Sequence, residues 1–361
     1  MLLRHTARQA RTCLRPLRPR RHASSFAGTF ANLPTAPKVL AYALIGAGGV
    51  GLSLGVYHYY KLPASPYPDT VTEHLRKALY YEGAGADAKQ AVQHYLDALE
   101  EATKLGLDQT SDKMTGLKIK IAGVYEQAGR LDSAIRVYSG LLGELKAPLR
   151  MQLQEEDRLR LLKRAIGTSV KIGELAAQVP GYKEKAEPAL SWALETALKE
   201  TTTKQNGDYN WLGPDEMSSL FERVGHYYYA EGRHQLALPL FLKALEAHGE
   251  TPTCRTVMLM NNVASSLSSQ SGQVPVQENA RLWAQRAREL KVKGQSAEEQ
   301  AECDYGKQMA LFNLGRIAEV LNQPDEARAR YTEVARQSRT LAHPDARELS
   351  REALIALKRM P

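Results

Sequence analysis

The sequence predicts an all-α protein built from repeated helical hairpins behind a single N-terminal transmembrane helix. Beyond residue 70, apolar residues recur with the period of an α-helix almost to the end of the chain, and no alternating strand pattern interrupts them. One spacing of small and aromatic residues returns three times within this region. Ahead of it, one uncharged segment is long enough to cross a lipid bilayer.

The N-terminal residues have the composition of a mitochondrial transit peptide. The chain has a formal net charge of +8, with 48 Lys and Arg against 40 Asp and Glu. Residues 1–38 contain eight of those basic residues and no acidic one, so the remaining 48 − 8 = 40 basic residues balance the 40 acidic ones. This balance excludes nucleic-acid binding, which requires a basic surface on the mature protein. The Arg-rich segment and the processing-like stretch Arg20–Ser25 predict a transit peptide over residues 1–24; a disordered basic tail is the alternative.

Val39–Tyr60 is predicted to be a transmembrane helix. It contains no charged residue, lies between Lys38 and Lys61, and is about 33 Å long at ~1.5 Å per residue. Tyrosines at its C-terminal end fit the interface of a bilayer. The alternative to a transmembrane helix is a hairpin buried within the protein. Small residues four positions apart predict a face for another membrane helix, unless they only make the anchor flexible. These residues are Ala43, Ala47, Gly51 and Gly55.

A Pro-rich linker, residues 61–70, precedes an array over residues 71–361. Three stretches of the array share one spacing of residues, which we call a ladder. In the first helix it has a small residue where the two helices cross, and then an aromatic or second small residue. After a turn, the second helix has an Ala and then a large residue one helical turn later. The ladders contain Ala122, Tyr125, Gly129, Ala134, Tyr138 and Leu141; Gly225, Tyr228, Gly232, Ala237, Phe241 and Ala244; and Gly315, Ala318, Ala327, Tyr331 and Val334. Three looser units lie around Ala78, Ile166 and Val263. The array is therefore predicted to be a tetratricopeptide-like solenoid of about six helical hairpins.

Two segments of this array resemble a known family. Residues 107–126 read LDQTSDKMTGLKIKIAGVYE, and residues 257–264 read VMLMNNVA. Both are similar to segments of the fungal Mgr-type adaptor subunits of the mitochondrial i-AAA protease. The resemblance implies a single-pass inner-membrane protein whose repeats face the intermembrane space. It also implies that the repeats bind unfolded or misfolded proteins and deliver them to the protease, beside a second adaptor subunit.

Catalytic and cofactor patterns are not found in the sequence. It contains no His-Glu-x-x-His, no Walker phosphate loop and no Gly-x-Ser-x-Gly elbow. The run Gly46–Gly51 matches a dinucleotide fingerprint, but the first acid, Asp69, follows three prolines, and no alternation of strands and helices follows. The histidines show no metal-ligand spacing, and Cys254 and Cys303 are expected to be buried thiols, with a disulfide as the alternative. We therefore predict a protein that catalyses no reaction and needs no cofactor or metal.

The predicted binding surface is the face formed by the first helix of each hairpin. Its mixture of aromatic, amide and charged side chains favours extended or unfolded segments, and it lacks the Lys and Asn clamp by which some related repeats bind a terminal carboxylate. The alternative is that these side chains only contact the next repeat. The candidates are Glu126, Arg164, Lys171, Glu222, His226, Tyr229, Asn261, Phe312 and Arg316.

Three other functions fit parts of this pattern. An outer-membrane import receptor also combines an anchor with such repeats, but its anchor normally starts the chain without a cleavable Arg-rich segment. A respiratory-complex assembly factor has the same architecture. A peptidase with a helical shell is the least favoured, because the sequence offers no catalytic constellation. The resemblance favours the protease adaptor.

Overall fold

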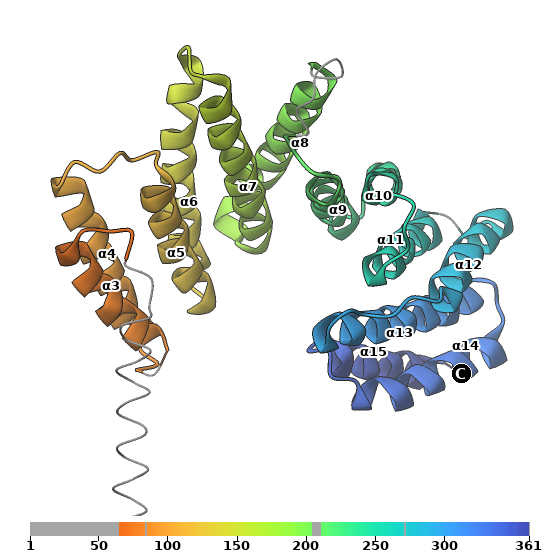
Figure 1. Cartoon of the computed structure of the whole chain (residues 1–361). Helices are drawn as coiled ribbons and strands as arrows, with labels where there is room; N and C mark the ends of the chain where they lie inside the picture. Colours follow the sequence, from red (N-terminus) through yellow and green to blue (C-terminus); the bar gives the residue numbers. More distant parts are fainter. Residues whose placement is uncertain (1–64, 84, 204–210, 271, 361) are drawn as a thin grey trace, which may run out of the picture. The chain divides into compact units, whose positions relative to one another are not determined.

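The computed structural model describes residues 65–83, 85–203, 211–270 and 272–360 (Figure 1). The predicted transit peptide, residues 1–24, and the predicted transmembrane helix, residues 39–60, lie outside these residues. Within the part of the chain that is described, no helix is long and apolar enough to cross a lipid bilayer. The residues from Pro66 to the C-terminus form one compact unit.

This unit is an all-α array of antiparallel helical hairpins. The described ranges contain thirteen α-helices and no strand. Consecutive helices pair as α3 with α4, and so on to α13 with α14, and α15 then packs on α14 (Figure 1). The tetratricopeptide-like solenoid predicted from the sequence is thereby confirmed, with six hairpins and one terminal helix. The helices are α3 (Asp69–Glu82), α4 (Ala88–Lys104), α5 (Asp112–Gln127), α6 (Leu131–Lys146), α7 (Glu155–Gln178), α8 (Ala186–Thr203), α9 (Pro214–Ala230), α10 (His234–His248), α11 (Cys254–Gln270), α12 (Val274–Glu289), α13 (Ala297–Val320), α14 (Pro324–Gln337) and α15 (Ala346–Arg359).

The small residue of each ladder lies where an aromatic ring of the second helix contacts the first helix. A Cβ atom on Gly225 would lie 2.7 Å from the Phe241 ring, and one on Gly315 would lie 2.8 Å from the Tyr331 ring. Both distances are shorter than any van der Waals contact, so a side chain at either glycine would push the two helices apart. The ladder therefore sets how closely the helices of a hairpin approach.

The turns of the three ladders end the first helix in the same way. The residue seven positions after the small residue has a positive φ, +70° at Gly129, +71° at Gly232 and +56° at Asn322. This left-handed conformation favours Gly and Asn, which explains the residue types at these positions. A common turn then places the second helix of each hairpin in the same register against the first.

The apolar core is shared between neighbouring hairpins. One buried cluster joins Tyr95 of α4 to Met114 and Ile121 of α5. Another joins Phe241 of α10 to α11, α12 and Ile317 of α13. No hairpin of the described array thus buries its apolar surface alone, and each depends on its neighbours for stability.

Cys254 and Cys303 form a disulfide, so the expectation of two free buried thiols is wrong. Their Cα atoms are 4.6 Å apart, and the residues are 1% and 0% exposed. The cause is the 24-residue helix α13, which packs directly on α11 as well as on α12. This packing brings together two residues that lie 49 positions apart in the chain.

Candidate protein-binding groove

Three hairpins repeat one polar arrangement, which we call the Tyr–Glu–cation triad. In the second hairpin, Tyr138 of α6 donates its hydroxyl to Glu126 of α5 at 2.7 Å, and Lys171 of α7 donates to the other carboxylate oxygen at 3.0 Å. The tyrosine and the glutamate belong to one hairpin and the cation to the helix that follows it, so each triad joins a hairpin to its neighbour. The other triads are Tyr95, Glu82 and Lys120, with distances of 2.7 and 2.6 Å, and Tyr331, Glu319 and Arg359, with distances of 2.6 and 3.0 Å.

The triads raise the pKa values of their tyrosines, and one of them lowers the pKa of its glutamate, Glu82. Burial, the hydrogen bond to glutamate and the glutamate charge raise the pKa values of Tyr95, Tyr138 and Tyr331 above their ordinary value of 10.0. Burial also raises the pKa of Glu82, but the hydrogen bonds from Lys120 and Tyr95 outweigh it and leave the pKa below the ordinary value. The raised pKa values keep the three phenols protonated at neutral pH.

We expect these three tyrosines to ionise later than ordinary phenols in an alkaline titration. A group whose pKa is raised in the folded state contributes stability that is fully present below pH 10 and is lost as the pH rises through the folded-state pKa. The tyrosinate absorbance should therefore show a late phase that coincides with loss of helical circular dichroism. The triple variant with Phe at residues 95, 138 and 331 should lose three tyrosines from that phase, while Tyr305, whose pKa burial raises to about 12, should still ionise late. A single ionisation step near pH 10 in the wild-type chain would contradict the triads.

The fourth hairpin lacks the triad. In the second and sixth hairpins the tyrosine lies 16 positions and the glutamate four positions after the small residue. In the fourth hairpin these two positions are Phe241 and Tyr229. The Tyr229 hydroxyl instead lies 3.3 Å from the hydroxyl of Ser269. Beside Phe241, a pocket of about 190 Å³ opens at this level of the array.

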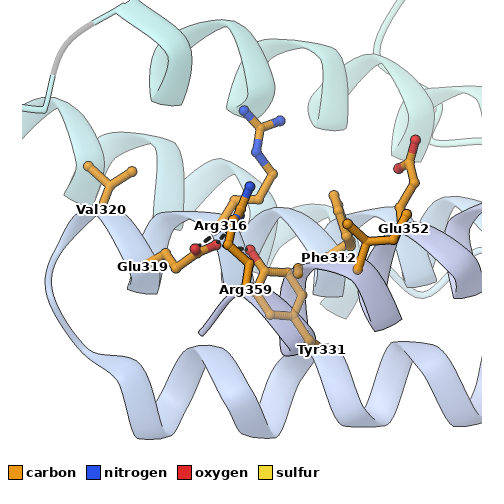
Figure 2. Close-up of a pocket in the computed structure, with 9 residues that line it drawn as sticks. Phe312, Arg316, Glu319, Val320, Tyr331, Glu352 and Arg359 are labelled. Carbon is orange, nitrogen blue, oxygen red and sulfur yellow. Dashed lines mark hydrogen bonds and ion pairs between the residues drawn. The ribbon is translucent and has the colours of Figure 1, made fainter. Parts of the chain in front are cut away.

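This pocket adjoins a second one of about 600 Å³, and together they form a surface that we call the Phe312 groove. The two pockets share Phe312 and Arg316 of α13 and Glu352 of α15. Figure 2 shows the second pocket, which extends from these residues to the triad of Tyr331, Glu319 and Arg359. The first pocket is further lined by His226, Tyr229, Phe241, Asn262, Met309 and Asn313.

The Phe312 groove contains an unpaired cation and an unpaired anion. Neither Arg316 nor Glu352 makes a hydrogen bond or an ion pair with any residue of the described ranges. In Figure 2 the Arg316 side chain extends away from Glu319, whose carboxylate is already occupied by Tyr331 and Arg359. Charged donors and acceptors thus lie beside aromatic faces, an arrangement that suits a ligand with both polar backbone groups and apolar side chains.

The structure brings four of the nine sequence-predicted residues together in this groove. They are His226, Tyr229, Phe312 and Arg316, and they come from the first helices of the fourth and sixth hairpins. Their role as a protein-binding surface stays a prediction. Two others, Glu126 and Lys171, pair with each other in a triad and join neighbouring repeats.

Arg164 and Glu222 also take part in contacts between hairpins. Arg164 lies 3.1 Å from Asp112 of α5, and Glu222 accepts a hydrogen bond from Arg255 of α11 at 2.6 Å. Burial raises the pKa of Glu222, but the hydrogen bond from His226 and the charge of Arg255 lower it to below the ordinary value. Both residues therefore fit the alternative to a binding surface, which is that these side chains only contact a neighbouring repeat.

The prediction of Asn261 as a surface residue is wrong. Asn261 is 2% exposed and donates a hydrogen bond to the Gly306 carbonyl of α13 at 2.8 Å. Because α13 packs across α11, it covers the position that is open on other first helices. Asn262, Asn313 and Glu352 also line the groove, although the sequence pattern does not select them. The sequence contains two adjacent asparagines, Asn261 and Asn262, on α11. Which of the two is exposed depends on which neighbouring helix covers α11.

The fold defines the class of this protein as a tetratricopeptide-like helical repeat protein. No protein-family model matches the chain. A TPR repeat-containing protein of Schizosaccharomyces pombe is 26% identical over 324 residues, which are 86% of this chain and 83% of that protein. The crystal structure of BtubC from P. vanneervenii overlaps with a TM-score of 0.48 at 13% identity, covering 74% of this chain and 92% of that one.

Two proteins of Saccharomyces cerevisiae give the particular resemblance. The mitochondrial inner membrane i-AAA protease supercomplex subunit MGR3 is 27% identical over 176 residues, which are 47% of this chain and 34% of MGR3. Protein MRG3-like is 31% identical over 117 residues, which are 31% of this chain and 25% of that protein. The resemblance to Mgr-type subunits of the i-AAA protease is thus confirmed. The matched residues span about a third of MGR3 and about a quarter of protein MRG3-like.

Proposed function

We propose that this chain is a mitochondrial inner-membrane adaptor that binds unfolded or misfolded membrane and intermembrane-space proteins and delivers them to the i-AAA protease. The Phe312 groove carries this proposal, because it offers aromatic faces and unpaired charges on one open surface. The similarity to MGR3, whose name places it in the i-AAA protease supercomplex, supports the partner. In this proposal the chain contributes affinity, and the protease contributes unfolding and cleavage.

The chemistry of the groove favours an extended segment over a folded surface. An extended segment has backbone N–H and C=O groups without partners, whereas a folded protein uses these groups in its own helices and sheets. Glu352 can accept from a backbone N–H, and Arg316 can donate to a backbone C=O. Phe312 and Tyr229, which are both partly exposed, can take up apolar side chains that folding would otherwise bury. The groove therefore fits a chain that has lost its native structure.

The membrane arrangement of the proposal depends on the predicted N-terminal segments. Import with Val39–Tyr60 as a stop-transfer helix would place the repeats in the intermembrane space, beside a second adaptor subunit. Protease treatment should then digest the array in mitoplasts and spare it in intact mitochondria. Digestion in intact mitochondria would support the outer-membrane import receptor, and protection in mitoplasts would indicate an array in the matrix.

Alanine at residue 312 is expected to weaken binding of an extended apolar peptide by about 30-fold, or ~2 kcal/mol, since large aromatic side chains dominate binding energies. The measurement is fluorescence anisotropy of a labelled unfolded reporter peptide with the full chain in detergent. Arg316→Ala should also weaken binding, and it removes no contact within the described array that folding requires. Arg347→Ala, an exposed arginine of α15 outside the groove, is the matched control. Wild-type affinity in both groove variants would exclude the Phe312 groove as the binding site.

Pull-down from detergent-solubilised inner membranes tests the proposed partner. The i-AAA protease should co-purify with the full chain, and the variant with Leu at Gly51 and Gly55 should lose the second adaptor subunit if the small-residue face packs against it. Recovery of respiratory-complex intermediates in place of the protease would support an assembly factor. The groove experiment and this pull-down fail independently, because one measures substrate affinity and the other measures assembly.

A further inference from the structure

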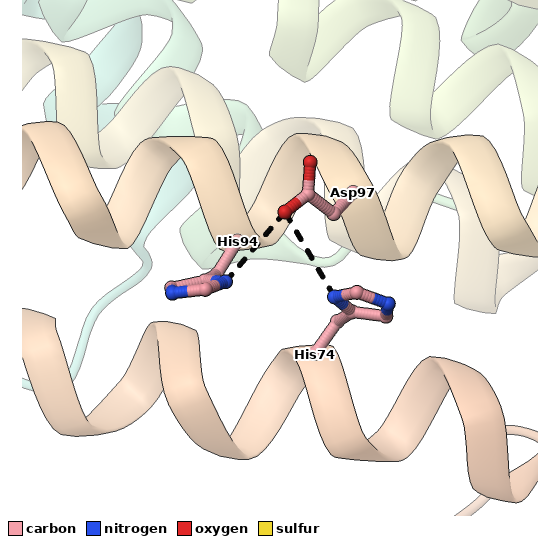
Figure 3. Close-up of side chains that lie close together, drawn as sticks. All are labelled: His74, His94 and Asp97. Atoms are coloured by element: carbon pink, nitrogen blue, oxygen red, sulfur yellow. Dashed lines mark ion pairs between the residues drawn. The ribbon is translucent and has the colours of Figure 1, made fainter.

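Three potential metal ligands meet in the first hairpin. His74 lies on α3, and His94 and Asp97 lie on α4 (Figure 3). The Nδ1 atom of His94 is 3.6 Å and that of His74 is 3.9 Å from the same carboxylate oxygen of Asp97. The three ligand atoms lie within 4.8 Å of one another. The packing of α3 on α4 brings together these residues, which show no metal-ligand spacing in the chain.

Both imidazoles present a nitrogen atom without a hydrogen-bond partner. The Nδ1 atoms of His74 and His94 are buried, and neither is bonded to any described residue. Their distances to Asp97 exceed those of a hydrogen bond. A buried polar atom without a partner costs free energy, and such atoms are rare in folded proteins. A cation between the three side chains would pair with both nitrogen atoms and with the carboxylate.

The surroundings hold these ligands in place and leave them accessible. Gln93 donates a hydrogen bond to the second oxygen of Asp97 at 2.9 Å, which orients the carboxylate. The His94 ring stacks on Tyr81, with centroids 5.4 Å apart and planes 15° from parallel. The side chains of His74, His94 and Asp97 are 35%, 21% and 32% exposed, so an ion can enter from solvent. Such outer contacts are typical supports of metal ligands.

We propose that His74, His94 and Asp97 bind a divalent transition-metal ion of the Zn²⁺ class, with water as a further ligand. Two imidazoles and one carboxylate suit Zn²⁺, whereas Mg²⁺ and Ca²⁺ prefer oxygen ligands. Around tetrahedral zinc, with bonds of about 2.0–2.1 Å, neighbouring ligand atoms lie about 3.3 Å apart. Small rotations of the three side chains bring the present atoms to that spacing. The ion then links α3 to α4 and stabilises the first hairpin of the described array.

Zinc titration of the full chain tests the site. The protein is purified in detergent, freed of metal and kept without reductant, because a reduced Cys254–Cys303 pair would itself bind zinc. Calorimetry should show one equivalent of bound Zn²⁺. His74→Asn and His94→Asn should each weaken the binding by at least about 100-fold, and Asp97→Asn by about 10-fold or more. Co²⁺ as a probe should give the visible absorption of a tetrahedral complex in the wild-type chain and not in the His74→Asn or His94→Asn chain.

The matched control is His343→Asn, which replaces an imidazole that stacks on Tyr305 far along the chain. It should bind zinc as the wild type does. Zinc should also slow amide hydrogen exchange in α3 and α4 of the wild-type and control chains and leave the His74→Asn chain unchanged. Equal zinc affinity in all variants, or no binding at millimolar zinc, would overturn the proposal. Circular dichroism of the metal-free variants separates loss of the site from loss of the fold.

Discussion

Replacement of Cys254 and Cys303 by alanine is expected to lower the free energy of unfolding by about 2–4 kcal/mol. The disulfide closes a loop between residues 49 positions apart and limits the conformations of the denatured chain. The midpoint of urea unfolding, followed by circular dichroism under oxidising conditions, should fall in the double variant. The disulfide joins α11 to α13, so the loss should be concentrated in the hairpins that form the Phe312 groove.

Reduction of the wild-type chain separates the covalent link from the packing of the two sulfur atoms. A reductant should lower the unfolding midpoint of the wild-type chain and leave that of the double alanine variant unchanged. The difference between the reduced wild type and the variant then measures the cost of the cavities left by the sulfurs. Equal midpoints for the oxidised and reduced wild type would show that the link contributes no stability.

Tyr331→Ala is expected to destabilise the last hairpin by about 3–5 kcal/mol, whereas Tyr331→Phe should cost only about 1 kcal/mol. Tyr331 is 0% exposed, and its ring lies on Gly315. Alanine leaves a cavity at this crossing of α13 and α14, and phenylalanine removes only the hydrogen bond to Glu319. Because repeats depend mainly on their neighbours, the effect should be local.

Hydrogen exchange monitored by mass spectrometry measures this local effect. Amides of α13, α14 and α15 should exchange faster in Tyr331→Ala, with little change in α3 and α4. The control is Tyr80→Ala, since Tyr80 is 59% exposed on α3 and fills no crossing between helices. Equal destabilisation by Tyr331→Ala and Tyr331→Phe would show that the hydrogen bond, and not the packing of the ring, dominates at this position.

The structure of each hairpin could be predicted because its determinants lie close together in the chain. Gly225 and Phe241 are 16 positions apart, and the helical period together with a short turn is enough to bring them into contact. The same reasoning identifies Gly129 and Gly232 as turn residues, both with positive φ. The resemblance to Mgr-type subunits likewise depended on short segments, residues 107–126 and 257–264.

Features that involve two hairpins could be predicted only in part. The alignment of first helices placed His226, Tyr229, Phe312 and Arg316 on the first-helix face, and these residues line the groove. The same alignment placed Asn261 on that face, where α13 buries it. The sequence pattern shows which residues share one face of a helix, but it does not show which other helix covers that face.

Local patterns in the chain were therefore sufficient for the all-α class, the six hairpins and the residue types at their crossings and turns. The pairing of Cys254 with Cys303, the meeting of His74 with Asp97 and the pockets around Phe312 required the packing of whole helices. The physical reason is the range of the contacts. Within a hairpin, the helical period and one turn determine which side chains meet. Contacts beyond that turn depend on the lengths and crossing angles of the intervening helices, which many weak apolar contacts set jointly.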